Sequence, residues 1–357
     1  VAESKFTWIS SNVAQTDGQP FRNVPANTVF TARNADGTEV RIGLFGLTVA
    51  SNAATYVTYR DPVEVAKEQV AALRSQVDIL IAVTHLSQDR DIDLVQKVPE
   101  IDLVLGGHEH ENSEVERGPD LTPISKADAN ARTVYVHELR FDTSNGRLDH
   151  ESTLQPITPD LADEPAVARA VEGWLKLAFD GFRAQGFDPT RAVATTSEPL
   201  DGREASVRSF PTRLTDLIAA GMLHAAPNAE LAMFNAGAIR IDDVIPAGEV
   251  TEYDIIRTLP FGGTILSARL TGAQVQRTLD QGLADVGTGG YLQLAKVTRT
   301  AAGDGWAVDG TSIDAERMYT VAMNDRVLAR LTRDNPDVTV EAEHGDIRRA
   351  LIAELQR

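Results

Sequence analysis

Two short apolar runs that end at histidines constrain the fold of this chain more than any other feature. The run Asp78–Val83 stops just before His85, and the run Ile101–Leu105 leads directly into the glycine turn GGHEH at Gly106–His110. Runs of this length, rich in β-branched residues, predict buried strands of a parallel sheet. Apolar residues at helical spacing in Pro62–Ser75 predict a crossover helix before the first strand. The pattern predicts an α/β fold with three of the seven histidines at one edge of a sheet.

The residue types at this edge suit a metal ion. Neutral imidazole is a ligand for Zn, Mn and Fe, and glycine lets the backbone approach a cation without a Cβ clash. Open α/β sheets also bind ligands at the carboxyl ends of their strands. Taken separately, His85 could simply end a strand and GGHEH could be an ordinary glycine turn. Together, on successive strands, they favour a metal site formed by His85, His108 and His110.

Composition narrows the class of protein. A length of 357 residues with 42% hydrophobic content is enough for two domains, each with its own core. The net charge of -18 and the lack of a basic run argue against a nucleic-acid polymer as partner. The absence of cysteine excludes disulfides, a zinc ribbon and a thiol nucleophile. No apolar run approaches the roughly 20 residues of a membrane span, and no signal peptide is recognised at Val1.

The pattern along the chain changes twice. Alternating strand and helix signals continue to about Gln155, although Asp120–Ala131 is predicted to be a loop. Thr158–Phe187 opens on prolines and acidic residues and then repeats apolar residues at helical spacing, which predicts an amphipathic helix packed on a domain. The same helix could connect two domains. Arg191–Arg357 forms the third part, with its own strand and helix signals.

The motif FNAGAIR at Phe234–Arg240 is the main candidate binding feature of the third part. A short strand, Leu231–Phe234, is predicted to end at Asn235, and the small residues that follow permit close approach of a ligand to the backbone. Arg240 offers a planar fork for a carboxylate or phosphate, and Asn235 offers a donor and an acceptor for the edge of a base. On these residues alone, a glycine turn with a solvated arginine is the simpler interpretation.

The segment from Thr84 to His110 resembles the second half of the calcineurin-like metallophosphoesterase domain in the 5'-nucleotidase family. In that family a THL strand end and a GGHxH turn supply three ligands of a two-metal centre. The resemblance extends over nearly the whole chain, because five further strings occur in the family's order. These are FTWISSNV at Phe6–Val13, RIGLFGLT at Arg41–Thr48, FNAGAIR at Phe234–Arg240, LPFGGTI at Leu259–Ile265 and GTGGYLQ at Gly287–Gln293.

This resemblance implies both a fold and a set of domain boundaries. Residues 1–157 would be the C-terminal part of the metallophosphoesterase domain, an incomplete two-sheet sandwich. Residues 158–187 would form a linker helix, and residues 188–357 would be a second α/β domain, the 5'-nucleotidase C-terminal domain that binds substrate. The resemblance implies hydrolysis of nucleoside monophosphates, or of related nucleotide esters and anhydrides, by water activated by two divalent metal ions. Those ions could be Zn, Mn, Fe or Co.

Site residues also follow from the resemblance. His85 and His108 would bind one metal ion and His110 the other. The residues that would bind the nucleotide are Asn235, Gly237, Arg240, Phe261 and Arg208, with the Phe261 ring stacked on the base. Arg208 matches less closely, since Thr215 and Asp216 replace the glycine and asparagine that are usual after this arginine.

The sequence departs from the family at two places. The family's upstream DxH and GNHE motifs, which carry the other metal ligands and the catalytic histidine, do not occur in these residues, so no catalytic residue can be assigned. The family also continues with an aromatic residue and a glycine-rich acidic loop after the segment Tyr319–Asp325, whereas Arg326 follows here. We expect either that one ring clamps the nucleoside or that the loop residues are missing from this sequence.

Four alternatives remain open. The same site would serve a 2',3'-cyclic-nucleotide phosphodiesterase with 3'-nucleotidase activity, or a UDP-sugar hydrolase. A di-manganese sulfur-oxidising hydrolase of related fold would not need Phe261 or Asn235. A protein of another class, a nucleoside-binding fragment without catalysis, would keep only the nucleoside pocket. The resemblance implies a periplasmic or extracellular location, and the sequence leaves metal identity, preferred nucleotide, oligomeric state and membrane anchoring open.

We expect these residues by themselves to release no phosphate from nucleotide esters. Two-metal hydrolysis needs both ions held close together, and only half of the family's ligands are present. The check is a colorimetric phosphate assay of the purified 357-residue chain with AMP and added Mn or Zn. Phosphate release above that of metal and AMP without protein would contradict the prediction.

Overall fold

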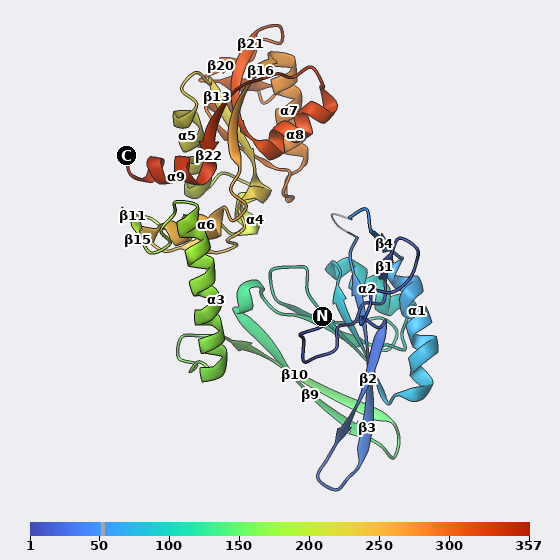
Figure 1. Ribbon diagram of the computed structural model, residues 1–357. Helices are drawn as coiled ribbons and strands as arrows, with labels where there is room; N and C mark the ends of the chain where they lie inside the picture. Colours follow the sequence, from blue (N-terminus) through green and yellow to red (C-terminus); the bar gives the residue numbers. More distant parts are fainter. Residues whose placement is uncertain (51–53) are drawn as a thin grey trace. The chain divides into compact units, whose positions relative to one another are not determined.

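The structure is a computed structural model that describes residues 1–50 and 54–357. The chain divides into two compact units, Val1–Ala162 and Asp163–Arg357, which are described separately (Figure 1). Both units combine sheets with helices, so the predicted α/β class is confirmed. Within the described residues, no helix is both long enough and apolar enough to cross a membrane.

A six-stranded sheet forms the centre of the first unit. Its strands lie in the order β2, β3, β5, β6, β8 and β7. Their bounds are Asn27–Arg33, Glu39–Thr48, Ile79–His85, Leu103–Gly106, Thr122–Lys126 and Ser113–Arg117. The four central strands β3, β5, β6 and β8 are mutually parallel, whereas β2 and β7 pair antiparallel at the edges. The carboxyl ends of four strands therefore meet at one edge.

Two helices cover one face of this sheet. Helix α1 (Pro62–Leu73) continues into the 3-10 turn η1 (Arg74–Gln76), and α2 (Gln88–Lys97) follows β5. Asp61 caps α1, since its side chain accepts hydrogen bonds from two backbone N–H groups of the first turn. The core beneath both helices contains Phe45, Leu80 and Val104, each fully buried. The crossover helix predicted over Pro62–Ser75 is confirmed as α1 and η1.

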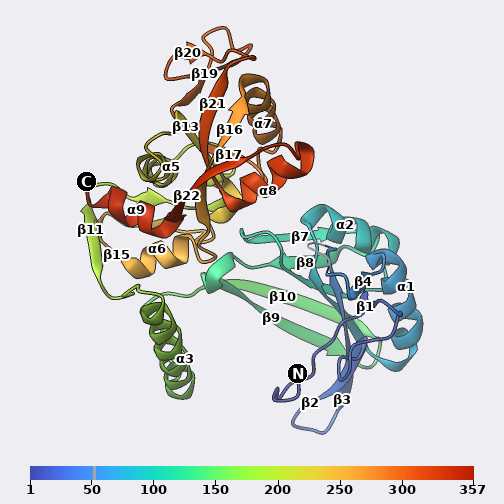
Figure 2. The same ribbon diagram turned by 45° about the horizontal axis from the view of Figure 1, so that its top comes forward.

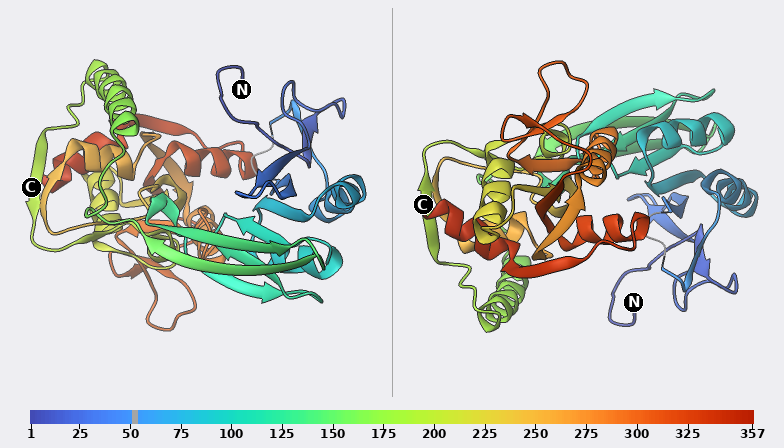
Figure 3. Two further views of the ribbon diagram at one scale, coloured as in Figure 1. Left: turned by 90° about the horizontal axis from the view of Figure 1, so that it is seen from below. Right: turned by 90° about the horizontal axis from the view of Figure 1, so that it is seen from above.

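A long hairpin covers the other face. Strands β9 (Thr133–Asp142) and β10 (Arg147–Pro156) pair over their full length and alternate between half-buried and exposed residues. Leu139, Phe141 and Leu148 on the inner face pack against a second cluster of the sheet that includes Ile42. Figure 2 and Figure 3 show this hairpin from further sides. The first unit thus has a helix layer, a sheet and a hairpin layer, and a separate small pair, β1 (Val13–Gln15) with β4 (Val57–Tyr59), lies beside them.

The predicted loop over Asp120–Ala131 is wrong. This segment contains β8, a central strand of the sheet, and the 3-10 turn η2 (Ala129–Ala131). Its sequence Thr-Pro-Ile-Ser-Lys carries one large apolar residue, Ile124, so the strand has no apolar run that marks it as buried. Its polar residues are satisfied by tertiary partners instead. Thr122, for example, donates a hydrogen bond of 3.0 Å to the carbonyl of Ile101.

A five-stranded sheet forms the centre of the second unit, in the order β17, β13, β21, β16 and β22. Its strands are Leu292–Ala295, Leu231–Asn235, Met318–Asn324, Thr264–Thr271 and Val340–Asp346. Helices α5 (Arg213–Ala225) and α9 (Ile347–Leu355) contribute to the core on one face. Helices α7 (Gly272–Ala284) and α8 (Asp325–Asp334) contribute to the core on the other face. The unit is therefore a three-layer α/β/α arrangement.

Short elements complete the second unit. The pairs are β11 (Ala192–Thr196) with β15 (Gly248–Thr251) and β12 (Leu200–Asp201) with β14 (Val244–Ile245), and the sheet of three is β18 (Val297–Arg299), β19 (Trp306–Val308) and β20 (Thr311–Ser312). Helices α4 (Glu204–Val207) and α6 (Glu252–Thr258) and the 3-10 turn η3 (Ala236–Ala238) connect them. The predicted strand before Asn235 is confirmed as β13.

Helix α3 (Pro165–Ala184) lies at the start of the second unit. The glutamate before it caps the helix by accepting a hydrogen bond from the N–H of Val167, and Pro165 occupies the first turn, as predicted. The predicted packing of its apolar face is wrong within this unit, because none of its residues is buried and Trp174 is 73% exposed. Its C-terminal part contacts α6, where the rings of Phe179 and Tyr253 lie 5.3 Å apart.

Phe45→Ala should destabilise the first unit by about 3–5 kcal/mol, because it removes a fully buried ring from the tightly packed interface between sheet and helices. Phe30→Ala, on the neighbouring strand, is the matched control, since Phe30 is 47% exposed and should change stability little. Urea unfolding followed by circular dichroism measures both. Equal unfolding midpoints for the two variants would contradict this view of the core.

Candidate functional site

The edge predicted to hold a metal ion is formed as expected. His85 is the last residue of β5, and GGHEH begins with the last residue of β6, the next parallel strand. The rings of His85 and His108 lie with their centres 5.2 Å apart and their planes nearly perpendicular, at 80°. Two imidazoles from different strands therefore face one small region at the carboxyl edge of the sheet.

The spacing of these two rings fits a shared metal ion. With a metal–nitrogen bond of about 2.1 Å, a tetrahedral ion bound by two imidazoles holds their ring centres about 5 Å apart. The observed separation of 5.2 Å matches this value. Among the residues that the structure describes, however, no three His, Cys, Asp or Glu side chains are already arranged around one point. His85 and His108 supply part of a coordination shell, and the ligand role of His110 stays a prediction.

The surroundings of His85 favour the form of imidazole that binds metals. Partial desolvation is the largest effect that lowers the pKa of His85, although the residue remains exposed, and the nearby His108 and the Lys126 ammonium lower it further. The carboxylate of Glu109 opposes these effects. A lowered pKa keeps the ring neutral near pH 7, with a lone pair available for a cation.

A buried lysine lies directly behind the histidines, and the sequence interpretation missed it. Lys126 ends β8, and its side chain is 0% exposed. Its ammonium lies 2.9 Å from a carboxylate oxygen of Asp91 on α2 and 2.5 Å from one of Glu109, the residue between His108 and His110. The only sequence signal for it is an isolated lysine in a segment whose pattern is typical of a loop.

The two carboxylates around Lys126 differ in environment. Burial raises the pKa of Asp91, and the contact with Lys126 only partly offsets this. Burial also tends to raise the pKa of Glu109, but hydrogen bonds from Lys126 and from the backbone N–H of Gln88 outweigh it and hold that pKa below its ordinary value. Glu109 therefore carries a negative charge into the histidine turn.

In the second unit, the predicted nucleotide-binding motifs meet at one edge of the five-stranded sheet. The side chain of Asn235, at the end of β13, donates a hydrogen bond of 3.1 Å to the carbonyl of Gly289 in GTGGYLQ. It also accepts one of 2.9 Å from Asn324, at the end of the parallel strand β21. Asn235 thus joins three segments of the chain, and these bonds use an acceptor and a donor that we assigned to a base.

Packing within the protein itself explains why residue 237 is a glycine. A Cβ atom at this position would lie 3.0 Å from both the Cα and the carbonyl oxygen of Gly289, and Gly237 donates a backbone hydrogen bond to that same oxygen. The small residue therefore permits two loops of the protein to pack together. The expectation that it permits the approach of a ligand remains a prediction.

Two arginines lie near each other beside these loops. Arg208, whose side chain is 19% exposed, is ion-paired with Glu204. Burial lowers the pKa of Arg208, and although Glu204 opposes this, the positive charge of Arg240 lowers it further. Arg240 is exposed, and its backbone N–H is bonded to the carbonyl of Thr258. Two like charges held together in this way would be relieved by an anion.

Phe261 is the exposed aromatic side chain of this edge. It lies in the turn between α6 and β16 and is 79% exposed. The next two residues, Gly262 and Gly263, have φ of 63° and 129°, a conformation that side chains rarely adopt. Gly263 is adjacent to the carboxylate of Asp325, to which a Cβ atom would come within 3.3 Å. The ring of Phe261 therefore lies beside a glycine turn and is largely exposed to solvent.

The chain passes directly from β21 into α8 at the place where the resemblance implies an aromatic residue and an acidic loop. Asn324 caps α8 by accepting a hydrogen bond from the N–H of Val327, and Asp325 is the first helical residue. A helix start replaces the loop here. Within the described residues, Phe261 therefore has no aromatic partner supplied from this position.

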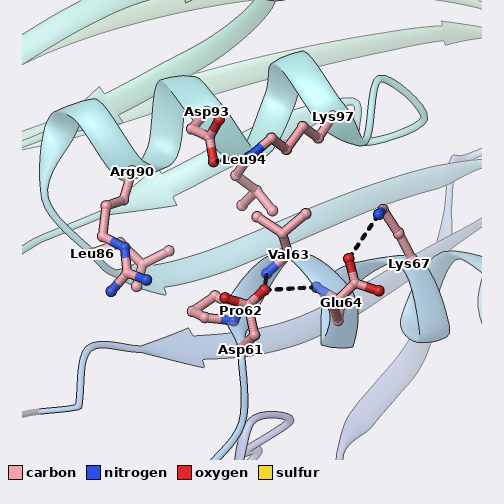
Figure 4. Close-up of a pocket in the computed structure, with 10 residues that line it drawn as sticks. All are labelled: Asp61, Pro62, Val63, Glu64, Lys67, Leu86, Arg90, Asp93, Leu94 and Lys97. Atoms are coloured by element: carbon pink, nitrogen blue, oxygen red, sulfur yellow. Dashed lines mark hydrogen bonds and ion pairs between the residues drawn. The ribbon is translucent and has the colours of Figure 1, made fainter.

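A cavity of about 210 Å³ between α1 and α2 lies outside both candidate sites (Figure 4). Lys67 on its wall is paired with Glu64 at 2.8 Å, and Lys97 is paired with Asp93 at 2.8 Å. Asp61 is occupied in capping α1. Leu86, the residue after His85, lines the cavity, but none of the predicted site residues does.

Comparisons with known proteins agree with these features. Residues 192–330 match the family model described as the 5'-nucleotidase C-terminal domain. The chain is 30% identical over 337 residues to the trifunctional nucleotide phosphoesterase protein YfkN of Bacillus subtilis. This match covers 86% of this chain and 22% of that protein. It is also 27% identical over 312 residues to a 5'-nucleotidase of Vibrio cholerae, in a match that covers 74% of this chain and 56% of that protein.

The fold is also that of a known structure. A 5'-nucleotidase precursor from Thermus thermophilus superposes with a TM-score of 0.77 at 21% identity, over 99% of this chain and 76% of that one. The implied α/β fold is thereby confirmed, and its second half contains the match to the 5'-nucleotidase C-terminal domain. The chain spans about a fifth of the Bacillus protein and just over half of the Vibrio protein, so the activities of these longer proteins are not assigned to it.

His85→Ala and His108→Ala should each weaken Mn²⁺ binding by about 10-fold or more, because each removes one of two imidazoles that face the same region. Isothermal titration of the metal-free protein with MnCl₂ measures the change. His224→Ala is the control, since His224 lies in the second unit and contacts Glu354. Equal Mn²⁺ affinity for all three variants would rule out the histidine edge as a metal site.

Proposed function

The chain belongs to the 5'-nucleotidase family, and we propose that it is part of a metal-dependent phosphohydrolase that acts on nucleotides. Its substrates would be nucleoside monophosphates or related nucleotide esters and anhydrides, and its products a nucleoside and phosphate. The pair of imidazoles at metal-binding spacing, His85 and His108, is the single observation that carries this proposal. The cluster of predicted nucleotide-binding motifs in the second unit supports it.

The first unit would bind divalent metal. His85 and His108 would hold one ion and His110 would contribute to a second, with Zn, Mn, Fe or Co as candidates. Bound metal ions would supply an activated water and stabilise charge on the attacking and leaving oxygens. The protein's own contribution is to hold His85 neutral, to fix the turn that carries His108 and His110, and to bury the charged groups behind it.

The second unit would bind the nucleotide. The exposed ring of Phe261 would stack on the base, and the guanidinium groups of Arg208 and Arg240 would hold an anionic group of the substrate. Asn235 and Gly237 would shape the floor of this pocket through their bonds to the GTGGYLQ loop. Base stacking discriminates little between bases, so this pocket would accept several nucleosides.

A second candidate is nucleoside binding without hydrolysis by these residues. It is favoured by one observation: among the described residues, no three metal-binding side chains are arranged around one point. The further alternatives, a 2',3'-cyclic-nucleotide phosphodiesterase with 3'-nucleotidase activity or a UDP-sugar hydrolase, would use the same residues and differ only in substrate. A sulfur-oxidising hydrolase would leave Phe261 and Asn235 without a role. We also propose, from the family, a periplasmic or cell-surface location.

Phe261→Ala should weaken adenosine binding by about 5- to 150-fold, since stacking on an aromatic ring is worth about 1–3 kcal/mol per base. The affinity can be measured by calorimetry without metal. Trp174→Ala removes an equally exposed ring from α3 and serves as the control. If the chain binds adenosine and Phe261→Ala leaves the affinity unchanged, the proposed stacking role is incorrect.

A further inference from the structure

The side chain of Lys126 lies at the meeting point of three segments. Its ammonium donates a hydrogen bond of 2.7 Å to the carbonyl of Leu86 and one of 2.5 Å to Glu109, and it is ion-paired with Asp91 at 2.9 Å. A lysine ammonium has three N–H donors, and three oxygens surround this one. The group is completely buried. Such a charge is retained only where its partners compensate for the loss of water.

Two of these oxygens belong to the segments that carry the histidines. Leu86 directly follows His85, and Glu109 lies between His108 and His110. The third oxygen, from Asp91 on α2, neutralises the ammonium and holds it in place. Lys126 therefore links the end of β5 to the turn after β6, although these segments lie 40 and 17 residues away from it in sequence.

The first glycine of GGHEH makes room for this lysine. A Cβ atom on Gly106 would lie 2.8 Å from Cε and 2.9 Å from Cγ of Lys126, too close for any side chain. Gly106 and Lys126 are also paired in the parallel register of β6 and β8. The glycine that we attributed to the approach of a metal ion thus permits the lysine to cross behind the turn.

The turn itself needs an external restraint. His108 has φ of 87°, a left-handed conformation that is unfavourable for a residue other than glycine. The next side chain, Glu109, is fixed at both oxygens: one accepts a hydrogen bond of 2.6 Å from the backbone N–H of Gln88, and the other binds Lys126. These two contacts hold the backbone beside His108 in place.

We propose that Lys126 is a positioning residue that fixes the two histidine-bearing segments relative to each other. It acts on His85 through the carbonyl of Leu86 and on His108 and His110 through the carboxylate of Glu109. The proposal rests on the proposed function only in treating these histidines as metal ligands. Partners of this kind, one contact behind the ligands, typically change metal affinity about 10- to 100-fold when they are removed.

The first test compares Glu109→Gln with Glu111→Gln. Glu109→Gln keeps the shape of the side chain but removes the charge that binds Lys126, whereas Glu111 is exposed and lies one residue beyond His110. Hydrogen exchange of metal-free protein reports the restraint on residues 106–112, and titration with MnCl₂ reports its consequence. We expect faster exchange and about 10-fold weaker Mn²⁺ binding for Glu109→Gln, and no effect of Glu111→Gln.

The second test removes the buried pair together. Lys126→Met combined with Asp91→Asn avoids leaving one buried charge unpaired. Its matched control is Lys97→Met with Asp93→Asn, an ion pair of 2.8 Å whose side chains are about half exposed on the same helix. We expect the buried double variant to lose at least as much Mn²⁺ affinity as Glu109→Gln, because it also removes the bond to Leu86. The triple variant should lose no more than the double variant, because the contact between Lys126 and Glu109 is already broken in it.

Three results would decide the matter. Exchange and Mn²⁺ affinity of Glu109→Gln equal to those of the unchanged chain would overturn the proposal. Fully additive losses in the triple variant would also overturn it, because Lys126 and Glu109 would then act separately. If the unchanged chain binds no Mn²⁺ but Glu109→Gln still accelerates exchange, the restraint stands and the metal site of the proposed function fails.

Discussion

The parallel pairing of β3, β5, β6 and β8 is the constraint on which the first unit depends. Parallel strands place all their carboxyl ends at one edge, so residues at 85, 106 and 126 become neighbours although they are far apart in the chain. The helices on one face and the hairpin on the other exclude water from the strands and leave that edge open. The chemistry of the edge then follows from which residue ends each strand.

The three strand ends carry complementary groups. β5 ends in an imidazole, β6 ends in a glycine that opens the histidine turn, and β8 ends in a buried ammonium. Lys126 places a buried positive charge behind the histidines, and the carboxylates of Glu109 and Asp91 balance it. Glu109 is thereby held at both carboxylate oxygens, beside the histidine turn.

In the second unit, contacts between loops bring the predicted binding residues together. Its nucleotide-binding motifs are joined through side-chain and backbone bonds among three loops, with Asn235 at their centre. The groups at this edge are an exposed ring, Phe261, an exposed arginine, Arg240, and a mostly buried arginine, Arg208, which is paired with Glu204. Apolar area for stacking and positive charge for an anion are what a nucleotide requires. Although the chain carries a net charge of -18, this edge therefore offers local positive charge to an anionic ligand.

The sequence by itself determined the features that depend on neighbouring residues. The apolar runs before His85 and Gly106, the helical spacing after Pro62 and the order of motifs along the chain predicted the α/β class, the histidine edge and the family. These signals are local, since strand and helix periodicity is set by which side chains share a face. Strand β8 escaped prediction because its sequence has no such periodicity, and only its position between two other strands makes it a strand.

Only the tertiary structure decided what depends on contacts between distant segments. The sequence pattern around Lys126 is typical of a surface residue, and its burial follows from oxygens supplied by Leu86, Asp91 and Glu109. The reason for Gly106 lies in the lysine beside it, and the reason for Gly237 lies in Gly289. The apolar positions of α3 predicted a packed face, but Trp174 remains exposed. Periodicity states which residues can be buried together, whereas the free energy of burial depends on partners that only the folded chain brings near.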